Sequence, residues 1–122
     1  MNIYLAGPMR GIPEWNFLAF QPAAKWLREQ GYTVFNPAEE DDPSQTLDDY
    51  ERDPLGTARE CFARDTQYIC KHADAVALLP GWHNSKGADA ECALALALGL
   101  KVFYLLKMPS GEWFLLEAED LG

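Results

Sequence analysis

Short apolar runs alternate with longer segments of helical periodicity along this 122-residue chain. Runs bounded by turn residues predict strands at residues 2–6, 32–35, 73–79 and 101–106. Apolar residues that recur every three to four positions predict helices at residues 14–30, 56–73 and 87–98. Strands separated by helices favour a parallel sheet with right-handed crossovers. We therefore expect one α/β domain over residues 1–122, a small flavodoxin-like or Rossmann-like three-layer sandwich with a parallel sheet of four to five strands.

Three features of the pattern refine this expectation. Pro22 lies inside the first predicted helix and should kink or restart it, because proline lacks the N–H that the helix needs. Residues 113–116 form a candidate edge strand. The helix at residues 87–98 is apolar on nearly all sides, which is more than one sheet can cover. Its outer face is expected to contact another subunit, which predicts a homodimer or a higher homo-oligomer.

Glu91 stands at the head of this otherwise almost wholly apolar helix. The preceding run at residues 73–79 is apolar enough to be a strand buried on both faces. In open parallel sheets, ligands bind beyond the carboxyl ends of the strands and against helix N-termini. Glu91 is therefore expected beside a ligand-binding crevice. A carboxylate near a helix start is also a good partner for the helix dipole, so a structural role stays open.

Asp65 lies on the expected inward stripe of the helix at residues 56–73, whose other members are Ala58, Cys61, Phe62 and Ile69. An ionised carboxylate on a buried face is costly unless it meets a partner. Asp65 therefore either makes structural hydrogen bonds or takes part in chemistry.

Two loops should bring further polar groups to the same crevice. The turn at residues 7–11 contains glycines, which let backbone amides approach a ligand, and Arg10, which offers a planar fork for a phosphate. The loop at residues 81–87 contains Trp82, which either stacks on a flat ring or packs in the core. The expected binding residues are Gly7, Pro8, Met9, Arg10, Gly11, Trp82, Asn84, Ser85 and Gly87.

Acidic residues dominate the charge of the chain. Its net charge of -9 disfavours binding to a nucleic-acid polymer. Residues 36–56 hold eight acidic residues, one basic residue and three prolines. This segment is predicted to be a long surface loop, which either closes over the crevice as a lid or is simply solvated.

Cysteine and histidine usage indicates neither a metal site nor a cofactor. The three cysteines and two histidines show no metal-ligand spacing. An odd number of cysteines without a signal peptide is typical of reduced thiols in the cytoplasm, where we expect this protein. The longest apolar run, at residues 92–100, is shorter than the roughly 20 residues of a membrane-spanning helix, so no membrane partner is expected.

In combination, these residues resemble the nucleoside 2-deoxyribosyltransferase superfamily, particularly its small, often phage-encoded members. The resemblance covers nearly the whole chain and includes residues 3–7, Asp65, residues 73–74, residues 87–91 and residues 99–102. Members of this superfamily cleave the bond between a nucleobase and deoxyribose. The resemblance implies that Glu91 attacks the anomeric carbon, that Asp65 works near the base and sugar, and that Tyr4 lies beside the nucleophile.

Details of the motif are similar to the branch that hydrolyses 2'-deoxynucleoside 5'-monophosphates. Six positions before the glutamate, that branch has a phosphate-binding serine, which Ser85 matches, whereas base-exchanging transferases usually have an acid there. Arg10 likewise resembles the branch's phosphate-binding arginine. Pro8 departs from the pattern, because it replaces a serine that also serves the phosphate. The expected ligand is a small nucleoside or nucleotide.

The two carboxylates suit this chemistry physically. Cleavage of an N-glycosidic bond passes through an oxocarbenium-like state that a nearby carboxylate stabilises or captures. Glu91, near a helix N-terminus, is expected to stay ionised as a nucleophile. Asp65, in an apolar stripe, is expected to have a raised pKa and to donate a proton to the leaving base. Whether water or a second base completes the reaction stays open.

Two other function classes remain compatible with the sequence. The first is a non-catalytic nucleotide-binding or sensor module, in which Glu91 only hydrogen-bonds a ribose. The second is an NAD glycohydrolase, as in Toll/interleukin-receptor-like domains, which share the general topology and also use a glutamate.

Overall fold

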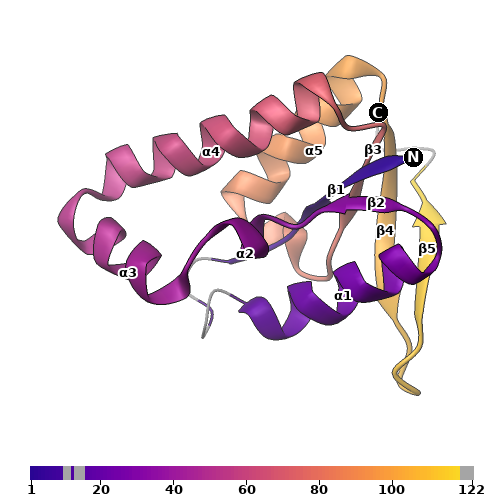
Figure 1. The fold of residues 1–122 in the computed structure, drawn as a ribbon. Coiled ribbons are helices and arrows are strands. Elements are labelled where there is room, and N and C mark those ends of the chain that lie inside the picture. Colours follow the sequence, from indigo (N-terminus) through magenta and orange to yellow (C-terminus); the bar gives the residue numbers. More distant parts are fainter. Residues whose placement is uncertain (10–11, 13–15, 119–122) are drawn as a thin grey trace.

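The computed structural model describes residues 1–9, 12 and 16–118. These residues form a five-stranded sheet with helices on both faces (Figure 1). The sheet order is β2-β1-β3-β4-β5. Its strands are β1 (Asn2–Ala6), β2 (Thr33–Phe35), β3 (Ala75–Leu78), β4 (Lys101–Lys107) and β5 (Trp113–Glu117). The expected arrangement of helices on a mostly parallel sheet is confirmed, whereas the likeness to flavodoxin-like or Rossmann-like folds stays a prediction.

The sheet is mixed rather than wholly parallel. The first four strands pair in parallel, but β5 runs antiparallel to β4 and pairs Trp113 with Lys107. The expectation of a purely parallel sheet is therefore wrong at this edge. The reason is the length of the connection, since residues 108–112 suffice for a hairpin whereas a parallel crossover needs about a dozen residues or more.

Five α-helices are described: α1 (Phe17–Glu29), α2 (Pro37–Glu40), α3 (Pro43–Arg52), α4 (Pro54–Lys71) and α5 (Lys86–Leu98). The expected restart at Pro22 is not observed, because α1 continues through it. Phe20 on one side of Pro22, and Ala23 and Ala24 on the other, are fully buried. Burial of both sides against the sheet keeps the two parts of α1 in one helix.

The acidic segment at residues 36–56 is helical, so its interpretation as a long loop is wrong. It forms α2, α3 and the first turn of α4. Each of these helices has proline at its first position, and each preceding residue caps the helix with its side chain: Asn36, Asp42 and Asp53. Proline is tolerated at this position because its missing N–H would have no helical partner there. The three prolines therefore start helices.

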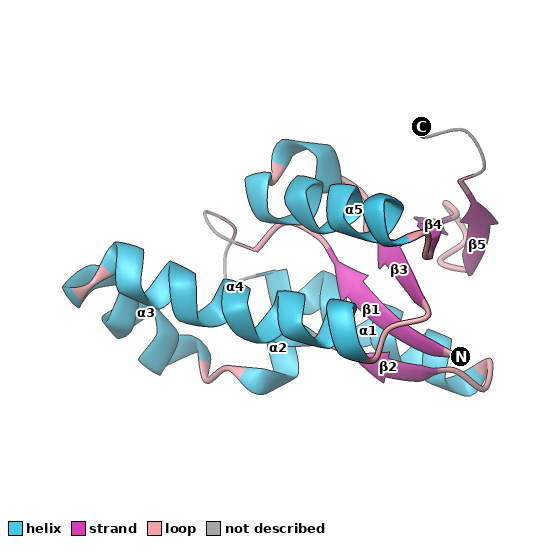
Figure 2. Cartoon of the chain, turned by 90° about the horizontal axis from the view of Figure 1, so that it is seen from above, coloured by secondary structure: helices cyan, strands magenta, loops and turns pink. Residues whose placement is uncertain are grey.

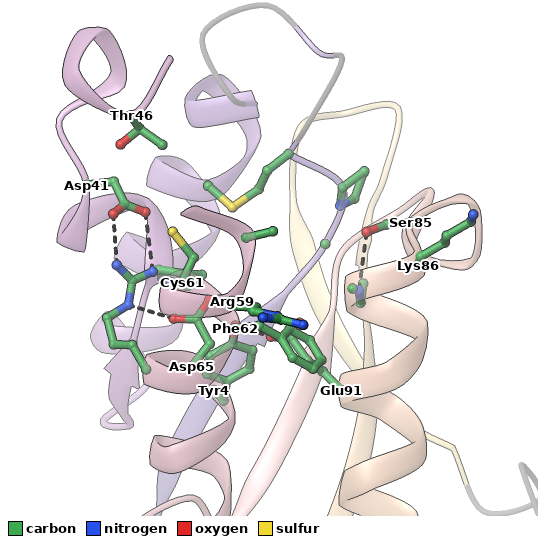
Figure 3. Close-up of a pocket in the computed structure, with 18 of the residues that line it drawn as sticks. Tyr4, Asp41, Thr46, Arg59, Cys61, Phe62, Asp65, Ser85, Lys86 and Glu91 are labelled. Carbon is green, nitrogen blue, oxygen red and sulfur yellow. Dashed lines mark hydrogen bonds and ion pairs between the residues drawn. The ribbon is translucent and has the colours of Figure 1, made fainter. Parts of the chain in front are cut away.

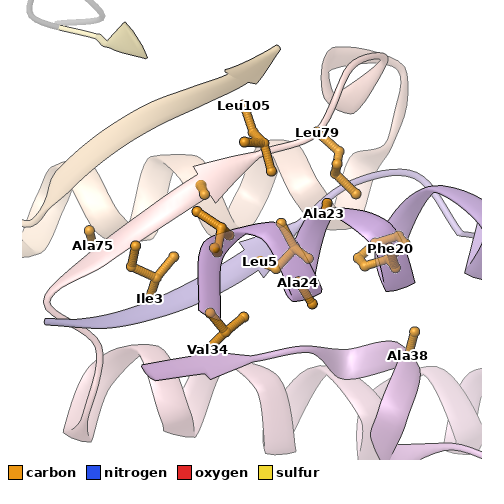
Figure 4. Packing of buried hydrophobic residues seen from close by; sticks show 12 residues of the cluster. Ile3, Leu5, Phe20, Ala23, Ala24, Val34, Ala38, Ala75, Leu79 and Leu105 are labelled. Carbon is orange, nitrogen blue, oxygen red and sulfur yellow. The ribbon is translucent and has the colours of Figure 1, made fainter. Parts of the chain in front are cut away.

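One face of the sheet packs an apolar core under α1 (Figure 4). Ile3 and Leu5 from β1 meet Phe20 and Leu27 from α1, and all four side chains are fully buried. At the end of β1 the packing tolerates no side chain. A Cβ on Gly7 would lie 2.8 Å from the Cβ of Leu79.

The opposite face is covered by α4 and α5 (Figure 2). Its buried cluster includes Tyr4, Ile69, Val76 and Cys92. On the outer side of α5, Leu96 and Leu98 are exposed, so the expected contact with another subunit stays a prediction. None of the described helices is long and apolar enough to cross a membrane.

Candidate active site

A pocket of about 710 Å³ opens between α4 and α5 where β1 and β3 end (Figure 3). Its described lining comes from residues 4–9, 37–50, 58–65 and 84–91. The crossover helices bring these separate segments together at the carboxyl edge of the sheet, as expected for a parallel α/β fold. The acidic segment contributes to the wall through α2 and α3, so it borders the pocket.

Tyr4 reaches the pocket because β1 alternates its side chains between the two faces of the sheet. Ile3 and Leu5 point to the apolar core, and Tyr4 points to the side of α4 and α5. Its ring stacks on Phe35 at a centroid distance of 5.6 Å, and Phe35 stacks on Tyr68 at 4.4 Å. These contacts hold the ring, so the hydroxyl has a defined position at the floor of the pocket.

Glu91 lies at this floor with only 6% of its surface exposed. The hydroxyl of Tyr4 donates a hydrogen bond to Oε2 of Glu91 at 2.5 Å. Burial raises the pKa of Glu91 to about 8, and the hydrogen bond from Tyr4 only partly opposes this shift. This shift is opposite to the expectation that Glu91 stays ionised, because it favours a protonated carboxyl near neutral pH. Loss of hydration outweighs the favourable position near the start of α5.

Asp65 is also buried, but it meets a cation. Nε of Arg64 donates to Oδ1 of Asp65 at 2.8 Å. Burial raises the pKa of Asp65, as the sequence predicted, while Arg64 and the hydroxyl of Tyr4 oppose the rise. The raised pKa makes Asp65 a suitable proton donor, although Glu91 carries the larger shift.

Arg64 connects this carboxylate to the acidic segment. Its Nη1 and Nη2 donate to Oδ1 and Oδ2 of Asp41 at 2.8 and 3.3 Å. A bidentate pair of this kind fixes both groups in orientation. Because Asp41 lies between α2 and α3, Arg64 ties the wall of the pocket to Asp65.

Tyr4 interacts with both catalytic candidates. Burial, together with the negative charges of Glu91 and Asp65, raises its pKa well above the usual value for a phenol. The hydroxyl therefore keeps its proton and acts as a hydrogen-bond donor. Tyr4, Asp65 and Glu91, the three residues predicted to be catalytic, all line the same pocket.

Most of the described loop residues that were predicted to bind substrate also line it: Gly7, Pro8, Met9, Asn84, Ser85 and Gly87. Ser85 caps α5, with its Oγ accepting a hydrogen bond from the amide of Ala88 at 3.2 Å. A Cβ on Gly87 would meet only the Oγ of Ser85, at 3.9 Å, so packing does not require glycine there. The missing side chain leaves room in the pocket at the start of α5.

Trp82 is the expected binding residue that the structure excludes from this lining. It packs against the cluster on the side of α4 and α5, with its ring centroid 6.3 Å from that of Tyr104. The chain reverses at Gly81, whose φ is +84°, and the 3₁₀ turn Trp82–Asn84 follows. This turn places the indole over the sheet. Arg10 and Gly11, which were also predicted to bind, lie outside the described residues.

Sequence reasoning missed several residues of the pocket: Asp41, Thr46, Tyr50, Arg59 and Arg64. Asp41, Thr46 and Tyr50 belong to the segment interpreted as a loop, and the capping pattern of its helices was the available signal. Arg64 follows from no local pattern, because its partner Asp41 is 23 positions away. Ala58, Cys61 and Phe62, which were expected on an inward stripe, line the pocket, while Ile69 of the same stripe is fully buried.

Charges in the lining are balanced. The described lining contains three carboxylates, from Asp41, Asp65 and Glu91, and three cationic side chains, from Arg59, Arg64 and Lys86. Within the part of the chain that the structure describes, no group of three or more His, Cys, Asp or Glu side chains is arranged to hold a metal ion. The pocket therefore offers two carboxyl groups with raised pKa values, together with cationic side chains, to an organic ligand.

The chain matches a known family model. A family model described as a domain of unknown function, DUF4406, matches residues 1–104. The matched range contains Tyr4, Asp65 and Glu91, together with the rest of the described pocket lining. A comparison with curated proteins found no match. Because the family model covers most of the chain, this protein belongs to the DUF4406 family.

Proposed function

We propose that this protein cleaves the N-glycosidic bond of 2'-deoxynucleosides, preferably as their 5'-monophosphates, with Glu91 as the nucleophile. One observation carries the proposal. A buried glutamate lies at the floor of a ligand-sized pocket, hydrogen-bonded to Tyr4 and beside a second carboxylate with a raised pKa. Enzymes that cleave glycosidic bonds typically use two carboxyl groups in different environments.

In the proposed reaction, an oxygen of ionised Glu91 attacks C1' of the sugar while the bond from C1' to the base nitrogen breaks. The electron pair of that bond goes to the base, and Asp65 donates a proton to it. Water, or a second base, then attacks C1' and releases Glu91. Asp65 accepts the proton that the attacking group loses, so the enzyme returns to its starting state.

The raised pKa of Glu91 has a role in this scheme. A neutral glutamic acid is a poor nucleophile, so its proton must pass to solvent before attack, and Glu91 takes up a proton from solvent again after turnover. Positive charge that develops at C1' stabilises the ionised form of a carboxylate beside it. The hydrogen bond from Tyr4 also favours the ionised form. Burial keeps the carboxylate poorly hydrated, which leaves it reactive once it is ionised.

Features at the start of α5 support the preference for a 5'-monophosphate. Ser85 supplies a hydroxyl, and Gly87 leaves its backbone accessible at a helix N-terminus. Lys86 adds a cation to the same part of the lining. These groups match a phosphate in charge and hydrogen bonding.

The decisive experiment measures release of free base from a panel of 2'-deoxynucleosides, their 5'-monophosphates and NAD. Wild type is compared with Glu91→Gln, and Glu60→Gln is the matched control because Glu60 is exposed on α4 and does not line the pocket. We expect base release that Glu91→Gln lowers by about 10³-fold or more, and that Glu60→Gln leaves unchanged.

The outcomes separate the alternatives. Release that requires an added acceptor base would indicate a transferase, and release without one a hydrolase. Nicotinamide release from NAD, with no action on deoxynucleosides, would contradict the proposal in favour of an NAD glycohydrolase. Nucleotide binding with no release from any substrate would identify a non-catalytic binding module.

We also propose that the protein forms a homodimer through the outer face of α5. Leu96 and Leu98 are 39% and 47% exposed there, on a helix whose other outward residues include several alanines. Burial of such a face between two copies is favourable. Light scattering at micromolar concentration should give twice the mass of the chain, and Leu96→Glu should give a monomer.

A further inference from the structure

Phe62 is a large apolar side chain that stays 40% exposed although it lines the pocket. It lies on α4, three positions before Asp65, so it is on the same side of the helix and about one turn away. An exposed phenyl ring in a binding pocket is unfavourable in water and becomes favourable when a ligand covers it. Trp82 was expected to supply a flat ring for stacking, but it lies outside the lining. Phe62, on α4, offers such a ring instead.

Arg59 is the second unusual side chain on this wall. Arg28, Arg52 and Arg64 each form an ion pair, whereas Arg59 forms none with the residues that the structure describes. The helix itself provides no partner, because positions 55, 56, 62 and 63, three and four residues away, carry no acid. In a chain of net charge -9, an arginine without an ion pair at the edge of a pocket is available for a ligand.

The spacing along α4 brings three kinds of chemistry close together. Arg59, Phe62 and Asp65 follow one another at intervals of three residues, which is about 4.5 Å of helix length per step. All three line the pocket, and Figure 3 draws them among the side chains between α4 and α5. The wall therefore presents a cation, a flat ring and a proton donor within the length of a nucleotide.

We propose that Arg59 and Phe62 form the substrate-recognition wall of the pocket: Phe62 stacks on the planar base and Arg59 binds the anionic group of a nucleoside phosphate. That the ligand is a nucleotide rests on the proposed function. That it is planar and anionic rests on the chemistry of Phe62 and Arg59. Stacking on a phenyl ring accepts any base, since every base has a flat π-face. Base preference then depends on polar groups elsewhere in the pocket.

Charge balance favours an anionic ligand. Glu91 is largely uncharged near neutral pH because burial raises its pKa to about 8, and Asp41 is paired with Arg64, so these two side chains offer little negative charge to repel an anion. Arg64 is already occupied by Asp41 and Asp65. Arg59 and Lys86 are the described cations of the lining that remain to offset a phosphate.

Equilibrium binding tests the inference without turnover. Titration calorimetry measures the affinity of a 2'-deoxynucleoside and of its 5'-monophosphate for three proteins. These are the Glu91→Gln variant alone and the same variant with Arg59→Ala or Phe62→Ala added. We expect Arg59→Ala to weaken the monophosphate by at least about 10-fold while changing the nucleoside little. Phe62→Ala should weaken both ligands by about 10- to 100-fold.

Arg52→Ala is the matched control, because it removes the same charge from an exposed arginine that does not line the pocket. Phe62→Leu keeps an apolar side chain without a π-face and should lose most of the affinity that Phe62→Ala loses. Equal effects of Arg59→Ala on both ligands, or effects no larger than those of Arg52→Ala, would overturn the role of Arg59. Undiminished affinity in Phe62→Ala would overturn stacking.

The proposed function can fail separately. Nucleotides that bind through Arg59 and Phe62 but are not cleaved by wild type would contradict the reaction and support the recognition wall. If wild type releases base and both Arg59→Ala and Phe62→Ala bind the ligands with normal affinity, the reaction would be supported and the recognition wall contradicted. Absence of binding by all these ligands to wild type and Glu91→Gln alike would contradict both.

Discussion

The two faces of β1 differ in chemistry although they alternate along the same five residues. Ile3 and Leu5 point into an apolar cluster that packs under α1. Tyr4, between them, points to the other face and hydrogen-bonds a buried glutamate. One face stabilises the fold, and the other holds groups that lose hydration when the chain folds.

A small α/β domain can divide stability and function between the two faces of one strand. A strand exposes successive side chains to opposite faces, so one face can specialise in packing while the other carries reactive groups. The reactive face pays in lost hydration of charged groups. Burial raises the pKa of Glu91 to about 8, which shows this cost. Four substitutions test this division between the two faces, beginning with the one that should cost most.

Leu5→Ala should damage the packing face. Leu5 is fully buried under α1, so its truncation removes apolar contacts and leaves a cavity. We expect a loss of about 2–5 kcal/mol in the free energy of unfolding, measured by urea denaturation. Leu18→Ala is the matched control, because Leu18 is 81% exposed and should cost little. Equal losses in the two variants would show that the α1 face is not the main source of stability.

Glu91→Gln should stabilise the fold at alkaline pH. The folded-state pKa of about 8 lies above the ordinary value of 4.5, so between these pH values the unfolded chain binds fewer protons than the folded protein. The stability contribution of Glu91 therefore falls as pH rises from about 4.5 to 8. The glutamine of the variant carries no charge at any of these pH values, and its side-chain oxygen can still accept the hydrogen bond of Tyr4.

Urea denaturation of wild type and Glu91→Gln at several pH values measures this effect. We expect the variant to gain on the order of a few kcal/mol relative to wild type as pH rises to 8. A constant difference between the two proteins over this range would show that Glu91 is ionised in the folded state. The raised pKa would then be wrong.

Arg64→Met should change Asp65 without changing the packing face. Removing the guanidinium leaves the Asp65 carboxyl buried without the cation that opposes its raised pKa. The pKa of Asp65 should therefore rise further, which NMR titration of its carboxyl carbon measures directly. Because Asp65 has the lower pKa of the two carboxyl groups, it controls the acid limb of the pH–rate profile in the proposed reaction, and this limb should move to higher pH in the variant.

Arg28→Met is the control for this change, because Arg28 forms a comparable bidentate pair with Glu39 away from the pocket lining. Both variants lose a salt bridge between separate elements, but only Arg64→Met should alter Asp65. A titration of Asp65 that is the same in wild type and Arg64→Met would contradict the role of Arg64.

Ser85→Ala should have the smallest effect on stability. It removes the cap of α5, which costs about 1 kcal/mol in typical proteins. Ser44→Ala is the control, since Ser44 lies in the first turn of α3 and Asp42 provides the cap there. If Ser85 also binds the phosphate, its loss should weaken a 5'-monophosphate more than the nucleoside. Thermal unfolding and the binding assay above measure the two effects.

Local patterns were sufficient to predict much of the fold. All four predicted parallel strands are present with boundaries within about two residues, and residues 113–116 do lie in an edge strand. The apolar runs determine this result, since each must be buried in the sheet. The acidic segment was mistaken for a loop because its composition is polar. Its Asx-Pro pairs at residues 36–37, 42–43 and 53–54 were the stronger local signal.

The candidate site was predicted less completely. Tyr4, Asp65 and Glu91 stood out because a polar group in an apolar pattern needs a reason, and all three meet in one pocket. Trp82 was misplaced because its side-chain direction depends on the turn at Gly81. Arg64 was missed because its contact with Asp41 joins residues that are far apart in the sequence.

The order of the amino acids is enough to show which residues are apolar, where helices can begin, and that one glutamate and one aspartate lie in apolar surroundings. These properties follow from side-chain chemistry and local spacing. Tertiary structure alone decided that β5 turns back on β4, that Arg64 spans Asp41 and Asp65, and that Glu91 is buried deeply enough to have a raised pKa. The physical reason is that hydration and electrostatic partners depend on groups brought together from distant parts of the chain.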